Sequence, residues 1–158
     1  MENRYNHFNE FLKNKFSERT LKICIDGGFT CPNRDGTKGH GGCIFCNEKG
    51  SATNLKSSLD ISNQVKHFLD YKKERANKFI VYFQNFTNTY APVDTLKGRY
   101  DASLLDERVR VLAIGTRPDC IDEEVAAVGD AIFWHVIHPG RAKCYSVRAK
   151  CKRSLFCK

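Results

Sequence analysis

The stretch Phe79-Ile80-Val81-Tyr82-Phe83 is a continuous apolar run that decides the fold class of this 158-residue chain. Five consecutive β-branched and aromatic residues are typical of a strand that is buried on both faces. A second strand of this kind is expected over 109–114, and a strand candidate precedes them at 21–25. Buried runs of this type favour a parallel sheet covered by helices.

Amphipathic helical patterns alternate with these strands. Helices are expected over 5–16 and over 60–75, where Asp60 is the predicted N-cap. Pro92 is predicted to open another helix, and Asp122-Glu123-Glu124 is typical of an acidic helix start. The apolar stripe predicted for the helix after Pro92 consists of Leu96, Tyr100, Leu104 and Leu105. The fold class is therefore α/β, with three strand–helix units recognisable.

Three long connections, at 26–57, 84–92 and 115–121, each follow a predicted strand. In a parallel sheet the carboxyl ends of the strands lie at one edge, so these three loops are expected to meet there. The first of them is too long to be a passive connector, which indicates a functional loop or one organised by a ligand.

The formal net charge of +8 is unevenly distributed. Residues 131–158 hold seven basic residues and no acid, which leaves 19 basic and 18 acidic residues over 1–130. Basicity of the whole chain is therefore no evidence for nucleic-acid binding. No apolar stretch approaches the ~20 residues of a membrane helix, and the first residues carry no secretory signal, so a cytoplasmic protein without membrane contact is expected.

Three of the eight cysteines, Cys31, Cys43 and Cys46, lie in the first loop. For a chain without a secretory signal, metal binding is a better interpretation of clustered cysteines than a disulfide framework. Three thiolates are one ligand short of a closed zinc site and of the usual four-cysteine iron–sulfur cluster. His40 could complete a zinc site, so the spacing alone favours a zinc site and an iron–sulfur cluster almost equally. Free buried thiols are the third interpretation.

The segment 23–47, which contains Cys-Pro-Asn-Arg-Asp-Gly and Gly-Gly-Cys-Ile-Phe-Cys, resembles the radical S-adenosylmethionine (SAM) superfamily. Within it, the chain is similar to the YtqA/MnmL-like subgroup, a relative of the elongator catalytic subunit. The resemblance continues through 82–90 and 113–119 and covers roughly residues 4 to 127. It implies an enzyme with a partial (β/α) barrel, of which this chain would contain the amino-terminal part.

The resemblance also implies cofactors and partners. Cys31, Cys43 and Cys46 would hold a 4Fe-4S cluster whose fourth iron binds SAM, and reductive cleavage would give a 5′-deoxyadenosyl radical. The implied substrate is the wobble uridine of tRNA, and an electron donor such as flavodoxin or ferredoxin is needed. Two other functions stay open: a zinc-stabilised RNA-binding module, and an enzyme of the same chemistry acting on a small metabolite.

Four further positions are implied as cofactor-binding residues, each beside a structural alternative. Phe45 would contact the adenine of SAM or else be a core aromatic residue. Gln84 and Asn85 would meet the methionyl amine or else cap a strand end. Arg117 would bind the cofactor carboxylate or else pair with Asp119.

After about residue 127 the sequence departs from the family, and only three strands are predicted. The chain is therefore divided into a core portion, 1–127, and a divergent basic tail, 128–158, which contains Cys144, Cys151 and Cys157. We interpret the tail as the product of a truncated or frameshifted gene, which could leave the fragment inactive. Two alternatives stay open: a second metal site formed by these three cysteines, and a basic arm that binds RNA. In this interpretation the third strand has an open edge.

Overall fold

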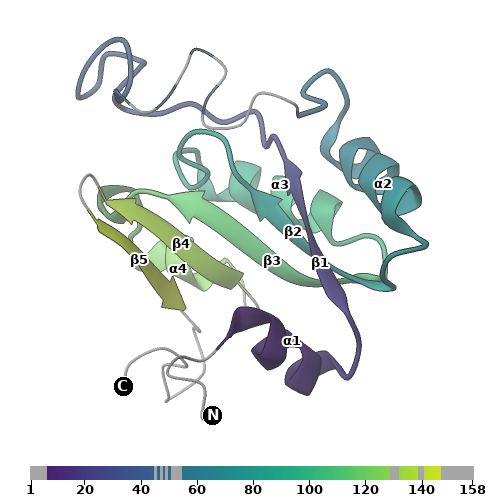
Figure 1. Cartoon of the computed structure of the whole chain (residues 1–158). Helices are drawn as coiled ribbons and strands as arrows, with labels where there is room; N and C mark the ends of the chain where they lie inside the picture. Colours follow the sequence, from purple (N-terminus) through teal and green to yellow (C-terminus); the bar gives the residue numbers. More distant parts are fainter. Residues whose placement is uncertain are drawn as a thin grey trace.

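The computed structural model describes residues 7–44, 46, 48, 50, 55–128, 132–138 and 141–146, with only the backbone described in the last two ranges. Within these residues the sheet has the order β1-β2-β3-β4-β5. Strands β1 (Thr20–Ile25), β2 (Lys78–Phe83) and β3 (Val109–Thr116) are parallel neighbours. Helices connect them in alternating βα units, which confirms the mixed α/β class (Figure 1). The sheet of the described residues does not confirm the partial barrel that the resemblance implies.

The helices form where the sequence patterns predict them. Helix α1 spans Phe8–Phe16, and α2 spans Ile61–Lys72 with the Asp60 carboxylate accepting a hydrogen bond from the backbone N–H of Asn63. Helix α3 spans Val93–Ser103, and α4 spans Glu123–Ala127 with Asp122 as its N-cap. A short 3₁₀ helix, η1 (Pro118–Cys120), precedes α4.

One part of the α3 prediction is wrong. Leu96 and Tyr100 are buried as expected, but the helix ends at Ser103, so Leu104 and Leu105 lie beyond it and are exposed. The helical turn that would carry the last two residues of the predicted stripe is therefore not formed, because the helix is capped at Leu104 and the chain continues to β3.

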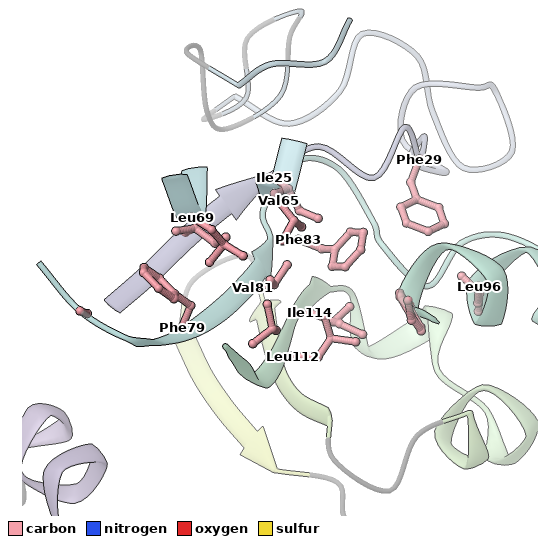
Figure 2. Close-up of a cluster of buried hydrophobic side chains, with 14 of the residues drawn as sticks. Ile25, Phe29, Val65, Leu69, Phe79, Val81, Phe83, Leu96, Leu112 and Ile114 are labelled. Carbon is pink, nitrogen blue, oxygen red and sulfur yellow. The ribbon is translucent and has the colours of Figure 1, made fainter. Parts of the chain in front are cut away.

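The two faces of the sheet are covered by hydrophobic clusters of different size. One face packs on α2, α3 and α4 in the main core, and Figure 2 shows its labelled side chains, such as Val81, Leu112 and Ile114, between the sheet and the helices. The other face packs on α1 through Leu12, which contacts Ile80 and Val111. Strands β2 and β3 are thus buried on both faces, as the apolar runs predict.

The prediction of only three strands, with an open edge at the third, is wrong, because the backbone of the following segment forms two more strands. Strand β4 (Ile132–His138) pairs in parallel with β3, and β5 (Arg141–Ser146) pairs antiparallel with β4 (Figure 1). The β4 segment is rich in β-branched and aromatic residues, which favours a strand despite the change of composition. Most of the remaining tail, including Cys151 and Cys157, lies outside the described residues, and the division at residue 127 stays a prediction.

Among the described residues, every helix falls short of the length and apolar character needed to cross a membrane.

Candidate metal centre

The three loops that follow β1, β2 and β3 meet at the carboxyl edge of the sheet, as their order predicts (Figure 1). The backbone N–H of Thr87 donates to the carbonyl of Thr30 at 3.1 Å, joining the second loop to the first. The backbone N–H and the side-chain Nδ2 of Asn88 donate to the carbonyl of Gly115, near the end of β3, at 3.1 and 2.8 Å. The hydroxyl of Thr89 donates to the carbonyl of Cys120 at 2.6 Å, joining the second loop to the third. Side chains from distant parts of the sequence therefore share one edge.

The cysteine loop is ordered by its own backbone hydrogen bonds. The N–H of Arg34 donates to the carbonyl of Cys31 at 2.8 Å, and the N–H of Gly42 donates to the carbonyl of Asn33 at 3.0 Å. The N–H of Cys46 donates to the carbonyl of Cys43 at 2.9 Å, which closes a turn across the two-residue spacing. The loop folds back on itself and brings Asn33 beside Gly42 and Cys43.

All three predicted ligands are free thiols in this loop. Cys31 is buried, while Cys43 and Cys46 are half-buried. Two of the sulfurs accept hydrogen bonds: Thr87 Oγ1 donates to Cys31 Sγ at 3.2 Å, and Asn33 Nδ2 donates to Cys43 Sγ at 3.2 Å. Donors aimed at sulfur stabilise negative charge there, which suits thiolates that ligate a metal.

The thiols are close enough to influence one another electrostatically. Burial raises the pKa of Cys46, and the neighbouring Cys43 raises it further, with a smaller contribution from Cys31, while Arg34 lowers it. Nearby positive charge favours the thiolate form of a cysteine. The guanidinium of Arg34 supplies part of that positive charge, and it also donates to the carbonyl of Cys46 at 3.4 Å.

A single ion does not fit the arrangement as it stands. Within the described residues, no three side chains of His, Cys, Asp or Glu are close enough to hold a metal ion. A tetrahedral zinc site requires sulfurs roughly 3.8 Å apart, given a Zn–S bond of about 2.3 Å. In a cluster each cysteine binds a different iron, so the sulfurs lie farther apart. Three thiols in one loop, with hydrogen-bond donors on two of the sulfurs, are the ligand type of iron–sulfur clusters.

His40, the fourth ligand of the alternative zinc site, is exposed and lies over Gly36. A Cβ at Gly36 would be 2.8 Å from Cε1 of the His40 ring. Gly36 has a φ of 92°, a conformation that glycine adopts without strain. A side chain at this position would therefore strain the turn and also collide with the His40 ring.

The predicted cofactor-binding residues have different surroundings. Phe45 lies outside the described residues. Gln84 is half-buried and its backbone N–H donates to the carbonyl of Ile25 at 3.3 Å. Asn85 is buried, and its side chain lies so close to Gly50 that a Cβ there would be 2.9 Å from Asn85 Cγ.

Arg117 forms the ion pair that was its structural alternative. Its Nε and a terminal nitrogen donate to the two carboxylate oxygens of Asp119 at 2.9 and 2.8 Å. Asp119 also pairs with Lys38 of the cysteine loop, so this carboxylate joins the first and third loops. The pKa of Asp119 is lowered, first by its hydrogen bonds with Arg117 and then by Lys38.

Sequence reasoning assigned no role to Asn33, Lys38 or Thr87. Each was visible only as a polar residue near a strand end or a cysteine. Their partners are 10, 81 and 56 residues away in the sequence, so only the folded chain identifies the contacts.

Comparison with known proteins identifies similar chains but no family. The chain is 42% identical over 132 residues to the uncharacterized protein YtqA of Bacillus subtilis, an alignment that covers 78% of this chain and 39% of that relative. It is 37% identical over 120 residues to protein YhcC of Escherichia coli, with coverages of 76% and 38%. It is 40% identical over 118 residues to the uncharacterized protein MJ0486 of Methanocaldococcus jannaschii, with coverages of 72% and 35%. The chain thus spans less than two fifths of the length of these relatives.

These findings correct the superfamily assignment made from the motifs. No protein-family model matches the chain, and no solved structure matches it. The relatives are named without an activity, so the shared name YtqA gives the assignment no support. Membership in the radical SAM superfamily is therefore wrong as an identification, and the candidate site has to be interpreted from its own geometry.

Proposed function

We propose that this chain binds a 4Fe-4S cluster through Cys31, Cys43 and Cys46 and uses it in the reductive cleavage of SAM. The observation that carries the proposal is the set of three free thiols, one buried and two half-buried, in one loop at the carboxyl edge of a parallel sheet, where ligands bind in α/β folds. Two of the three sulfurs accept hydrogen bonds from side chains, which favours their role as thiolate ligands.

A bound cluster with three cysteine ligands supplies one electron and one iron free of protein ligands, which is the chemistry that SAM cleavage requires. The protein residues hold the three thiolates, limit the access of water to Cys31, and place positive charge beside the site through Arg34.

A cavity of about 550 Å³ lies beside the cysteine loop and has the size of a small-molecule site. It is bounded by Pro32 and Lys38 of the first loop, by Tyr90 of the second, and by Asp119 and Cys120 after β3. Arg117 is held by Asp119 at this edge, so a cofactor carboxylate would bind Arg117 by sharing it with Asp119 or by displacing that side chain.

The electron is proposed to come from a carrier such as flavodoxin or ferredoxin. The proposed substrate is the wobble uridine of tRNA, which only the resemblance of the motifs implies. Both partners can be tested once the cluster is established, by reduction with each carrier and by analysis of tRNA nucleosides after incubation.

The first experiment is anaerobic reconstitution with iron and sulfide, followed by visible absorption, with zinc measured in parallel. We expect a broad band near ~400 nm, typical of iron–sulfur charge transfer, that is lost in Cys43→Ala. Cys24→Ala is the matched control, because Cys24 is a half-buried thiol on β1 outside the loop. Stoichiometric zinc without the band, lost in His40→Ala, would contradict the proposal and support the zinc module.

Cleavage is tested by reducing the reconstituted protein with dithionite in the presence of SAM and measuring methionine and 5′-deoxyadenosine. We expect Arg117→Ala to weaken SAM binding, whereas the control Arg110→Ala, an exposed residue of β3, should not. A reconstituted cluster that yields neither product would contradict the proposed activity while leaving the metal site intact.

A further inference from the structure

Thr87 links the second strand-end loop to a predicted cluster ligand. The residue is buried, and its hydroxyl donates to Cys31 Sγ at 3.2 Å. Its backbone is fixed on both sides, since its N–H donates to the carbonyl of Thr30 at 3.1 Å and its carbonyl accepts from the N–H of Tyr90 at 3.0 Å. The backbone position is thus fixed, and burial of the side chain restricts its rotation, so the hydroxyl has little freedom to move away from the sulfur.

The turn that presents Thr87 has an unusual backbone. Phe86 has a φ of 62°, a left-handed conformation that costs a residue with a side chain of order 1 kcal/mol or more. The Phe86 ring lies 5.4 Å from the guanidinium carbon of Arg34, whose side chain also donates to the carbonyl of Cys46. The residues 86–87 thus contact the cysteine loop at two places, near Cys31 and through Arg34.

We propose that Thr87 is a positioning residue of the three-cysteine centre, which holds Cys31 and raises the reduction potential of the cluster bound there. This inference rests on the proposed function. A hydrogen bond to a ligand sulfur is stronger when the cluster carries the extra electron, because the sulfur is then more negative. The reduced form is stabilised more than the oxidised form, which raises the potential.

The test compares Thr87→Val, which keeps the shape but removes the hydroxyl, with Thr87→Ser, which keeps the hydroxyl. Both full-length variants are reconstituted anaerobically with iron and sulfide, and the midpoint potential is measured by a titration monitored by electron paramagnetic resonance. We expect Thr87→Val to shift the reduction equilibrium about tenfold towards the oxidised form, which is about 59 mV for one electron. Thr87→Ser should restore the potential of the unmodified protein.

Thr37→Val is the matched control. Thr37 lies in the cysteine loop, but its hydroxyl is hydrogen-bonded to the hydroxyl of Tyr90 at 2.9 Å and not to a sulfur. Its potential should equal that of the unmodified protein.

The outcomes separate this inference from the proposed function. If the unmodified chain forms no cluster, the proposed function is contradicted and this inference with it. If the cluster forms and Thr87→Val has an unchanged potential, only this inference is overturned. Retention of the cluster by Thr87→Ser but not by Thr87→Val would support positioning by the hydroxyl, and loss in both variants would overturn it.

Discussion

The middle of the sheet and its carboxyl edge are held together by different interactions. In the middle, Val81, Leu112 and Ile114 pack between the sheet and the helices with almost no exposed surface (Figure 2). At the edge, the buried residues are mostly polar, and they include Asn85, Thr87, Asn88, Thr89 and Thr116. The contacts there are hydrogen bonds between the second loop and the ends of β2 and β3 rather than apolar packing.

This difference separates stability from site geometry. Apolar packing has no strong directional preference, so the core resists unfolding but does not position one atom against another. Hydrogen bonds from Thr87 and Asn88 require particular partners at particular distances, and they fix the second loop against Cys31 of the first loop and against the end of β3. We therefore expect core substitutions to affect the whole molecule and edge substitutions to affect the loops first.

The largest effect is expected for Leu112→Ala in the core. Leu112 is 2% exposed, and removing a buried leucine typically costs about 2–5 kcal/mol because a cavity remains. Urea unfolding measures this loss, and Leu105→Ala, at a residue that is 77% exposed, is the control with little expected change. Equal costs for both variants would contradict the assignment of Leu112 to the core.

A smaller effect, concentrated at the edge, is expected for Asn88→Ala. The Nδ2 of Asn88 donates to the carbonyls of Phe83 and Gly115 at 3.1 and 2.8 Å, so the variant leaves two buried acceptors without this donor. The Gly115 carbonyl keeps its bond from the backbone N–H of Asn88. We therefore expect a loss of about 1–3 kcal/mol, which is the cost of one buried group left without its partner. Hydrogen exchange should accelerate over 84–92 and 115–121 before it does in the strands.

Asn88→Asp sharpens this test. A carboxylate cannot donate to the two carbonyls and would be buried beside them, so it should destabilise the protein more than alanine does. A variant with Asp that is as stable as the unmodified protein would show that donation by this side chain does not hold the edge together.

The smallest effect concerns the ion pairs of Asp119 and depends on pH. The pKa of Asp119 is lowered by Arg117 first and then by Lys38, so its carboxylate stabilises the folded chain above the unfolded pKa of about 3.9. This stability is lost as the pH falls below that value. Unfolding by urea between pH 6 and pH 3 should show a shallower acid dependence for Asp119→Asn than for the unmodified protein.

The control is Asp101→Asn, an exposed aspartate on α3 that forms no ion pair within the described residues. It should keep the acid dependence of the unmodified protein. An identical dependence in Asp119→Asn would mean that the contacts of Asp119 with Arg117 and Lys38 add nothing to stability in solution.

Much of the fold could be predicted from local patterns. The run 79–83, the cap at Asp60 and the acidic start after Asp122 each specify an element through residues that are close in sequence. The helix end at Ser103 could not be read in this way, because Leu104 and Leu105 continue the helical spacing of apolar residues. Strand β4 was missed because the change of composition after residue 127 outweighed its own β-branched and aromatic residues.

The candidate site also has a part that the sequence indicated and a part that only the structure shows. The spacing of Cys31, Cys43 and Cys46 already indicated a metal centre, and the strand order already indicated where it would lie. The contacts of Arg117 with Asp119 were foreseen only as one of two alternatives. The roles of Thr87 and Lys38 had no signal in the sequence, since threonines and lysines near strand ends are common and their partners are distant in the chain.

The sequence by itself determined the first three strands and the approximate positions of the helices, and that three thiols lie in the loop after the first strand. These properties depend on the periodicity of apolar residues and on short spacings, which act between near neighbours in the chain. Only the tertiary structure decided that Thr87 donates to Cys31 and that Asp119 joins Lys38 to Arg117. Such contacts depend on directional bonds between separate loops, and the parallel sheet brings those loops together only when it folds.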